Sequence, residues 1–593
     1  MDIFVAQRRQ RQGCGTHVLV RSKRCKGVGA PAKIGSRHWL SDVIFMRGTV
    51  LIFFFLLASC SNEQSHVEST GHPSLKLGLV SGSGTEPEIG PVGKNAIHWF
   101  DGTLEEAFKK SGKEGKPIFL YWGAIWCPPC QEIKHTVFKS SAFIELSELF
   151  VPVYLDGDTD RAQIWGEQFD VKGYPTMIVF SPKGEELTRI PGGIDVERYN
   201  SVLALALNEM RSTATLVSLA RDEPTALKEN DYQQLAYYSW WQDSVAMPEG
   251  VDQAALFLAL SESAPAGPLS ARFFMSYLSV LTQSALTEPA LALHERTTLG
   301  VTDLAALETI LSSDELSLAC WDTLAYAAAD ILPLVSADRR DALRSKWLDQ
   351  IFGLRHHASL SRAEQLAGWY PVLEGRLSDG QFEGLTPLSK ADKQMLINEL
   401  RVAEIATTDN YERQSVIYQV SSLYRSAGLI SEARSLMLAE LDRSKSPYYF
   451  MSSLSSLAEE QGDIEGALSW RRKAYERAEG EATRFQWGVS YVQTLIRLSP
   501  QSVEMINELS RKVIAGVSSP HALLAGRNFR RLEALSRAMW TWDPGSDTQE
   551  DSYMVTIQNI CAGHPEDSLQ ARQCASLMHT DTKAQRVNIE VAG

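Results

Sequence analysis

The chain has 593 residues, of which 44% are hydrophobic and 22% are charged, and its formal net charge is −14. A chain of this length is too long for one hydrophobic core and favours about four domains. Ten basic and two acidic residues lie in residues 1–59, so the rest of the chain is more acidic than the total suggests. Such an acidic surface argues against nucleic acid and anionic lipid headgroups as partners.

Residues 46–59 are predicted to form a targeting signal. Met46 and Arg47 make a short basic start, residues 50–57 read VLIFFFLL, and small residues lead to Cys60. This order is typical of a secretory signal peptide. Its end, Leu-Ala-Ser-Cys, resembles the lipobox of bacterial lipoproteins, which implies cleavage before Cys60 and lipidation of its thiol. A transmembrane helix is the alternative, but the apolar run is much shorter than the ~20 residues that a span needs.

The segments around this signal are expected to lack a core. If Met46 is the true translation start, residues 1–45 are an artefactual or disordered extension. Residues 60–93 are rich in Ser, Gly, Glu and Pro and are predicted to be a flexible linker. We therefore expect a lipid-anchored protein of the bacterial periplasm. Ser61 after the cysteine favours the outer membrane, by analogy with lipoprotein sorting.

Residues 94–211 are predicted to form an α/β domain. A helix begins after Thr103, and a buried strand covers the apolar run 116–122. The remaining predicted elements are helix 131–138, strand 150–155, helix 161–169, strands 176–180 and 186–190, and helix 199–209. This order favours a mixed sheet covered by helices.

The rest of the chain is predicted to be all-α. Residues 212–400 show amphipathic helical segments without a period. In residues 401–545 an internal repeat is visible, because Val420, Leu423, Gly428, Ile430 and Ala433 recur 34 residues later. This interval resembles the tetratricopeptide helical hairpin, although a generic helical bundle is the alternative. Residues 546–593 are predicted to be a helical tail that contains two cysteines.

The Cys127-Pro128-Pro129-Cys130 segment follows a predicted buried strand and begins a helix. A sulfur at a helix N-terminus faces unpaired N–H groups, which favour the thiolate. Cys130, one turn further on, is placed to resolve a mixed disulfide with Cys127, and Trp126 offers an apolar flank to a peptide. Zinc is the alternative, but it needs two more ligands and only His135 lies nearby. We expect neither a metal nor a cofactor.

Trp126 with the cysteine pair, together with Gly173-Tyr174-Pro175-Thr176 further on, resembles the thioredoxin superfamily. The resemblance implies a thioredoxin fold and a cis Pro175 that faces the cysteines. It also implies that Trp126, Tyr174 and Thr176 contact substrate. A closer likeness, to the periplasmic domains of thiol:disulfide interchange proteins, is carried by Lys116-Pro117, Glu132 and Asp156.

Two departures from the thioredoxin pattern affect the expected chemistry. Thioredoxins have a buried Asp six residues before the first cysteine, where this chain has Tyr121. Glu132 is the candidate to transfer the proton instead, with a solvated helix residue as the alternative. Pro128 and Pro129 lack N–H groups near the Cys127 sulfur, so we expect a less acidic thiol and a more reducing couple than in a strong oxidant.

Two further patterns were weighed for sites. Asp156, Asp158, Asp160 and Glu167 match ligand positions of a calcium loop, but Arg161 stands where its sharp turn requires glycine, so calcium is not expected. In an oxidising compartment Cys561 and Cys574 are candidates for a structural disulfide across a short turn. Cys320 is expected to be a buried apolar residue.

These features predict a membrane-tethered periplasmic thiol:disulfide oxidoreductase of the reductase type. Its expected partners are protein thiols and disulfides and an upstream redox protein, with a further protein partner on the helical region. The alternative is a helical-repeat scaffold protein whose thioredoxin fold is redox-inactive.

Overall fold

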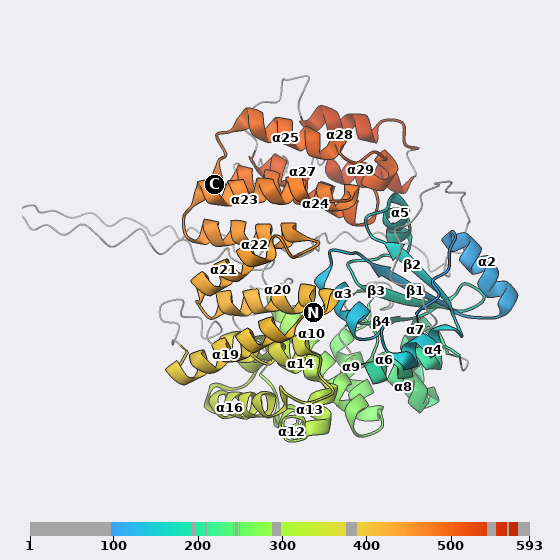
Figure 1. Ribbon diagram of the computed structural model, residues 1–593. Coiled ribbons are helices and arrows are strands. Elements are labelled where there is room, and N and C mark those ends of the chain that lie inside the picture. The colour runs from blue at the N-terminus through green and yellow to red at the C-terminus, as the bar shows by residue number, and fades with distance from the viewer. Residues whose placement is uncertain are drawn as a thin grey trace, which may run out of the picture.

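The structure is a computed structural model. It describes residues 96–192, 196–207, 210–240, 242–243, 247, 250–287, 298–374, 388–542, 553–565 and 568–578. The predicted extension, signal and linker, with Cys60, lie outside these ranges. None of the helices within them combines the length and the hydrophobicity that a membrane span requires. An α/β domain and a large helical region make up the described part of the chain (Figure 1).

The α/β domain is built on a four-stranded sheet with the strand order β2-β1-β3-β4. β1 is parallel to β2 and antiparallel to β3, and β3 is antiparallel to β4. In chain order the elements are α2 (Leu104–Glu114), β1 (Ile118–Gly123), α3 (Pro128–His135), α4 (Ser141–Ser147), β2 (Val151–Asp156), α5 (Asp160–Gln168), β3 (Thr176–Phe180), β4 (Glu186–Ile190) and α6 (Val196–Leu205).

Alternation along β1 explains why helices cover both faces of the sheet. Phe119 and Tyr121 pack with residues of α3, α4 and α6, whereas Leu120 and Trp122 pack with residues of α2 and α5 on the opposite face. Successive side chains of a strand point to opposite faces, so an uninterrupted apolar strand needs apolar cover on both. The first of these clusters continues into the helical region and includes Leu216.

The predicted element order lacks α4, and in this it was wrong. Ser140 caps this seven-residue helix by accepting a hydrogen bond from the Phe143 N–H, and Phe143 is fully buried. Ser is a favoured N-cap residue, but two turns are too short for helical periodicity to be visible in the sequence.

From residue 213 onward the described elements are all helical, as predicted. They are α7 (Thr213–Asp222), η1 (Pro224–Ala226), α8 (Glu229–Ala236), α9 (Gln253–Ser263), α10 (Pro268–Thr287), α12 (Val301–Ile310), α13 (Asp314–Ala319), α14 (Trp321–Tyr326), α15 (Ala328–Ile331), η2 (Leu332–Leu334), α16 (Ala337–Leu354), α17 (Arg362–Ala367), α18 (Tyr370–Glu374), α19 (Lys390–Ala406), α20 (Asn410–Ser426), α21 (Ile430–Glu440), α22 (Pro447–Glu460), α23 (Ile464–Arg477), α24 (Glu481–Leu498), α25 (Val503–Ala515), α26 (Pro520–Leu523), α27 (Gly526–Trp542), α28 (Tyr553–Cys561) and α29 (Leu569–Leu577).

The 34-residue interval corresponds to two equivalent helical hairpins, α20–α21 and α22–α23. Gly428 and Gly462 occupy the two turns with φ values of 73° and 74°, a left-handed conformation that glycine adopts without strain. Leu423 and Leu457, one interval apart, are both fully buried. Residues that recur in the sequence therefore fill the same positions in successive hairpins.

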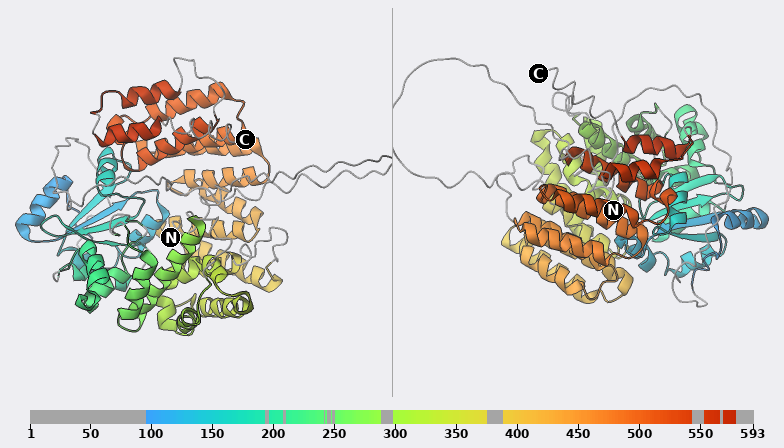
Figure 2. Two further views of the ribbon diagram at one scale, coloured as in Figure 1. Left: turned by 180° about the vertical axis from the view of Figure 1, so that it is seen from behind. Right: turned by 90° about the horizontal axis from the view of Figure 1, so that it is seen from above.

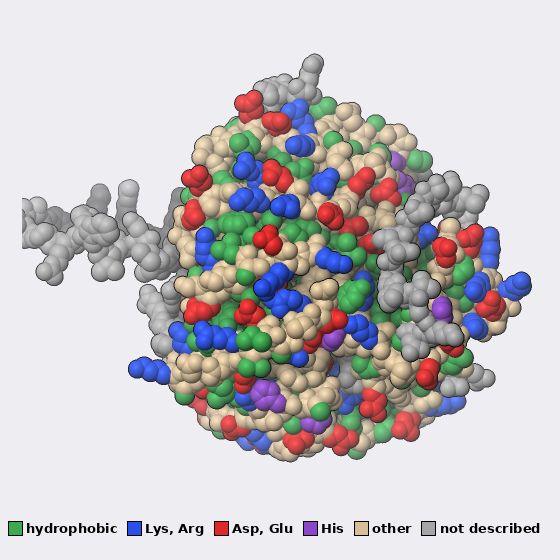
Figure 3. Space-filling view, in the orientation of Figure 1, with side chains coloured by type: hydrophobic (Ala, Val, Ile, Leu, Met, Phe, Trp, Pro, Cys, Tyr) green, Lys and Arg blue, Asp and Glu red, His purple; other side chains and the backbone are tan. Residues whose placement is uncertain are grey.

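The helical region forms an arc around the α/β domain (Figures 1 and 2). At one end α7 and α8 contact β4 and α6, in the middle α20 contacts α3, and at the other end α26 and α27 contact α5. On the face seen in Figure 3, acidic and basic side chains are interspersed. The α/β domain thus lies on the inner side of the arc, with α3 facing its middle.

Candidate functional site

The cysteine pair lies where β1 leads into α3. Cys127 is the N-cap residue of α3, and its sulfur accepts a hydrogen bond from the Cys130 N–H at 3.2 Å. The two cysteines are joined as a disulfide, with their Cα atoms 5.1 Å apart. Pro128 and Pro129 fill the first two helical positions, where a missing N–H costs little. Residue type and position therefore agree with the helix start expected from the sequence.

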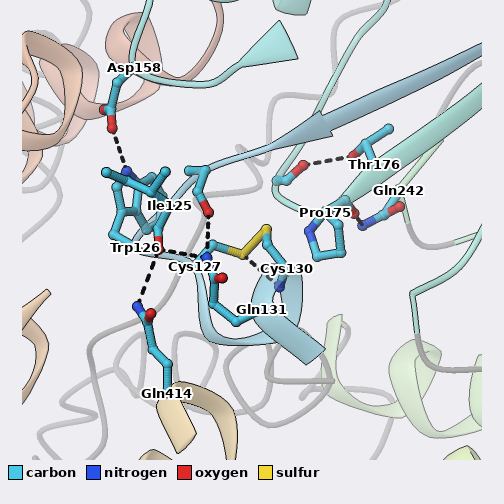
Figure 4. Close-up of a disulfide and its surroundings, with 12 residues drawn as sticks. Ile125, Trp126, Cys127, Cys130, Gln131, Asp158, Pro175, Thr176, Gln242 and Gln414 are labelled. Carbon is cyan, nitrogen blue, oxygen red and sulfur yellow. Dashed lines mark hydrogen bonds between the residues drawn. A yellow bond between two sulfur atoms is a disulfide. The ribbon is translucent and has the colours of Figure 1, made fainter. Parts of the chain in front are cut away.

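Gln131 fixes the loop that precedes the disulfide (Figure 4). Its side-chain amide donates to the Ile125 carbonyl at 2.6 Å and to the Ala124 carbonyl at 3.3 Å. Gln414, from α20, donates to the same Ile125 carbonyl at 3.3 Å. The loop is therefore held from both the α/β domain and the helical region.

The Pro175 loop lies against α3. The Tyr174–Pro175 peptide bond is cis, as the resemblance implied. A Cβ added to Gly192 would lie 2.9 Å from Pro175 Cγ and 3.0 Å from Ile133 Cδ1 of α3, so these elements are in close contact. Thr176 donates its hydroxyl hydrogen to the Gly173 carbonyl at 2.7 Å, within the loop.

The Pro175 carbonyl accepts a hydrogen bond from another part of the chain. Gln242, which follows α8, donates to it at 2.9 Å. Figure 4 shows this contact and the Pro175 ring on the Cys130 side of the disulfide. A backbone carbonyl between Tyr174 and Thr176, two expected substrate contacts, therefore already accepts a hydrogen bond from within the chain.

Trp126 connects the disulfide loop to the residues that surround it. Its indole N–H donates to Asp158 Oδ2 at 2.6 Å, and its ring meets Tyr174 edge-on at 5.8 Å between centroids. On its other side it stacks on Tyr449 of α22 at 5.9 Å, with an interplanar angle of 21°. Arg527 of α27 lies over the same indole at 4.6 Å.

The helical region covers the disulfide. Trp126 is 2% exposed, Cys127 is 3% exposed and Cys130 is fully buried. They form one apolar cluster with Tyr448, Tyr449, Met451, Ala474, Ala478 and Trp487 of the helical region. No local pattern in the sequence indicated this contact, because residues more than 300 positions apart form it.

Glu132, the candidate proton-transfer residue, points toward the helical region. Its Oε2 accepts a hydrogen bond from the Ser415 hydroxyl of α20 at 2.5 Å. Tyr121 is fully buried, and burial, reinforced by Asp156, raises the pKa of its hydroxyl. Tyr121 therefore remains protonated at neutral pH and does not replace a carboxylate.

Sequence reasoning missed a buried charged group one turn beyond the second cysteine. Lys134 is 9% exposed and Asp156 is 5% exposed. Burial lowers the pKa of Lys134, and the nearby Asp156 opposes that shift. The signal was available, since residues four apart share a helix face and Lys134 follows Cys130 by four. Lys134 and Asp156 are thus further candidates for proton transfer.

The acidic loop after β2 contacts the helical region. Asp158 accepts hydrogen bonds from Trp126, from Thr483 of α24 and from Arg527. Glu167 Oε2 accepts from the Gly526 N–H at 2.8 Å. Within the described residues no cluster of three or more His, Cys, Asp or Glu is arranged to hold a metal. His135, the residue weighed as a zinc ligand, lies 3.2 Å from Asp409.

The other described cysteines lie in the helical region. Cys561 and Cys574 are joined as a disulfide between α28 and α29, with their Cα atoms 5.6 Å apart. Next to this bridge, Gln573 donates to Glu167 Oε1 at 2.9 Å. Cys320 is a free buried cysteine, and burial raises the pKa of its thiol to about 12.

Comparison with known proteins agrees with this geometry. A family model described as a thioredoxin-like domain matches residues 104–207. An H-type thioredoxin of Brassica oleracea is 33% identical over 91 residues, which cover 15% of this chain and 68% of that protein. The chain belongs to the thioredoxin family. The match leaves the helical region outside the shared segment.

Two longer relatives share the same segment only. The protein disulfide-isomerase erp38 of Neurospora crassa is 27% identical over 115 residues, or 18% of this chain and 31% of that protein. The thiol:disulfide interchange protein DsbD of Ralstonia nicotianae is 28% identical over 109 residues, which are 18% of either protein. The chain therefore spans less than a third of the length of either of these relatives.

The ion pair between Lys139 of the α/β domain and Asp409 of the helical region predicts a pH dependence of stability. Asp409, which caps α20, accepts from Lys139 at 2.6 Å, and its pKa is lowered to about 2 because hydrogen bonds from Lys139 and two backbone N–H groups outweigh its burial. A lowered acid pKa contributes stability above the unfolded value near 3.8, and that stability is lost as the pH falls toward 2.

We expect Asp409→Asn, which keeps the capping oxygen, to lower the urea midpoint at pH 7 by an amount equivalent to about 1 kcal/mol or less. The difference from wild type should persist down to pH 4 and shrink by pH 3. A difference that is constant between pH 7 and pH 3 would show that the charge of Asp409 contributes nothing.

Proposed function

We propose that this chain is a thiol:disulfide oxidoreductase in which Cys127 is the nucleophile and Cys130 the resolving cysteine. The observation that carries the proposal is the position of Cys127 as the N-cap of α3, with its sulfur accepting the Cys130 N–H. An N-terminal helix position stabilises negative charge on that sulfur. Membership of the thioredoxin family supports the same reaction.

The reaction has two balanced steps. In the reduced enzyme the Cys127 thiolate attacks a substrate disulfide, so that one substrate thiol leaves and a mixed disulfide forms. The Cys130 sulfur then gives up its proton and attacks the Cys127 sulfur, which releases the second substrate thiol. The substrate gains two electrons, the Cys127–Cys130 disulfide forms, and an upstream dithiol must reduce it again.

The proton that the Cys130 thiol loses needs an acceptor close to the cysteine pair. Glu132 is our first candidate, and Lys134 with Asp156 forms the second. Glu132 accepts a hydrogen bond from Ser415, which ties the orientation of its carboxylate to the helical region. Lys134 and Asp156 are both buried, which makes them the alternative route.

The direction of the reaction is proposed from the two prolines. Pro128 and Pro129 have no N–H, so Cys130 supplies the donor to the Cys127 sulfur. Fewer donors stabilise the thiolate less, and a less stable reduced form makes the pair a reductant rather than a strong oxidant. We therefore propose the reductase type.

A second function, a redox-inactive scaffold, is favoured by one observation. Cys127 is only 3% exposed, so in this arrangement the sulfur is not open to a substrate. In that case the helical repeats would carry the function. The experiment below separates the two proposals.

Catalysis can be measured with dithiothreitol as reductant and a fluorophore-labelled glutathione disulfide, whose emission rises on cleavage. We expect the full chain to accelerate cleavage and Cys127→Ser to abolish the acceleration. Cys130→Ser should accumulate a mixed disulfide visible by mass. Cys320→Ser is the matched control and should keep full activity, because Cys320 is buried within the helical region. If wild type and Cys127→Ser cleave equally, the scaffold proposal replaces the enzyme.

We also propose that Cys60 carries a lipid that anchors the protein to a periplasmic membrane, the outer one in preference to the inner. The support is the order of basic, apolar and small residues that ends at Cys60. In a bacterial host, wild type should sediment with membranes and Cys60→Ser should not. Ser65→Ala, which lies outside the Leu-Ala-Ser-Cys motif, is the control. Wild type in the soluble fraction would contradict the anchor.

A further inference from the structure

The contact between the helical region and the disulfide loop is centred on a buried carboxylate. Asp158, with a side chain 13% exposed, accepts from Trp126 and Thr483 and pairs with Arg527, whose side chain is 2% exposed. Burial raises the pKa of Asp158, and Arg527 opposes that shift. Removing one partner of such a pair is strongly destabilising, because it leaves the other charge buried alone.

The backbone of the helical region approaches this carboxylate closely. Gly480 has a φ of 77°, and a Cβ at that position would lie 2.9 Å from Asp158 Cγ. Tyr449, also from the helical region, stacks on Trp126 and meets Trp487 edge-on at 5.2 Å. The surface of the helical region is therefore closely packed against Asp158 and Trp126.

Further contacts around this centre are mostly polar. Ser415 donates to Glu132, the Asn528 N–H donates to Gln163 Oε1 at 3.1 Å, and Arg530 donates to the Val171 carbonyl at 2.8 Å. Polar groups of this kind regain hydrogen bonds from water when two surfaces separate. Over the disulfide the apolar part of the contact is the cluster around Trp126. A second apolar cluster, which includes Leu216, joins the α/β domain to α7–α10 away from the disulfide. The part of the contact that lies over the disulfide is thus suited to opening and closing.

Thiol–disulfide exchange requires the attacking sulfur to reach a substrate sulfur directly. Cys127 is 3% exposed beneath Tyr449 and its neighbours, so the cover must move before any substrate reacts. A low-molecular-mass disulfide needs only a small displacement of the helical region to reach Cys127. A disulfide within a folded protein needs the loss of the Asp158 contacts as well, because its bulk must enter between the two surfaces.

We propose that Tyr449, Thr483 and Arg527 are specificity-determining residues, which hold the helical region over Cys127 so that small disulfides react and folded protein disulfides are excluded. The inference deepens the proposed function and rests on it for the reaction. The substrate class it assigns is low-molecular-mass or extended disulfides, of the size of glutathione disulfide.

Access can be measured without turnover, on the reduced full chain. The rate of alkylation of Cys127 is compared for N-ethylmaleimide and for a polyethylene-glycol maleimide of several kilodaltons, with peptide mass identifying the modified cysteine. In wild type the large reagent should react much more slowly than the small one. Arg527→Met should reduce the ratio of the two rates by about tenfold or more, because Asp158 is left unpaired and the cover opens.

The matched control is Arg537→Met on the same helix. The Arg537 side chain is 46% exposed and pairs with Glu533 of α27 itself, so its loss should leave the ratio of rates unchanged. Thr483→Val, nearly the same shape without the hydroxyl, is the second variant, in case Arg527→Met does not fold. It should lower the ratio in the same direction by a smaller factor.

Turnover supplies the second readout. Wild type should cleave the labelled glutathione disulfide well and insulin poorly, and Arg527→Met should gain activity on insulin relative to the small disulfide. Equal alkylation of wild type by both reagents, or equal ratios in Arg527→Met, Thr483→Val and Arg537→Met, would overturn the inference. If the alkylation rates are as expected but no disulfide is cleaved, the helical region does restrict access to Cys127, and the proposed oxidoreductase function is wrong.

Discussion

The Asp158 carboxylate joins the two parts of the molecule. It follows β2 in the α/β domain, binds the indole of the tryptophan next to the disulfide, and pairs with Arg527 of the helical region. A buried carboxylate requires a cation and hydrogen-bond donors, and here the donors come from both parts. The position of the helical region over the disulfide is therefore tied to the position of Trp126.

The covered sulfur has a thermodynamic consequence. A disulfide is neutral and tolerates an apolar cluster, whereas a thiolate in the same place loses its hydration. Contact of the helical region with the disulfide loop therefore favours the oxidised pair or the protonated thiol. Formation of the Cys127 thiolate favours separation of the two surfaces. By linkage the two equilibria influence one another equally. The helical region thus affects both the access of substrate and the chemistry of the pair.

Local features of the fold were predictable from the sequence. The strands at 176–180 and 186–190 matched those of the structure, since short apolar or alternating runs bounded by turn residues define them. The start of α3 followed from the cysteine and the two prolines, and the two hairpins from the glycines at their turns. In the α/β domain the predicted order lacked α4, because two turns of helix leave no visible period.

The surroundings of the site were not predictable in the same way. Trp126 was taken as a surface for a peptide, but it stacks on Tyr449, a contact between residues 323 positions apart that no local pattern encodes. The acidic residues after β2 imitated a calcium loop, yet Asp158 and Glu167 bind donors of the helical region. Glu132 was weighed as a proton-transfer residue or a solvated helix residue, and its hydrogen bond from Ser415 of the helical region was not predictable.

The central claim is that Cys127 and Cys130 form a reversible, reducing couple within the full chain. The most direct measurement is its reduction potential, obtained by equilibration in glutathione or dithiothreitol buffers, acid quenching, and alkylation of the unfolded chain for mass analysis. We predict a two-electron titration near the thioredoxin value of about −270 mV. A pair that does not titrate, or one near the value of about −120 mV that strong oxidants have, would contradict it.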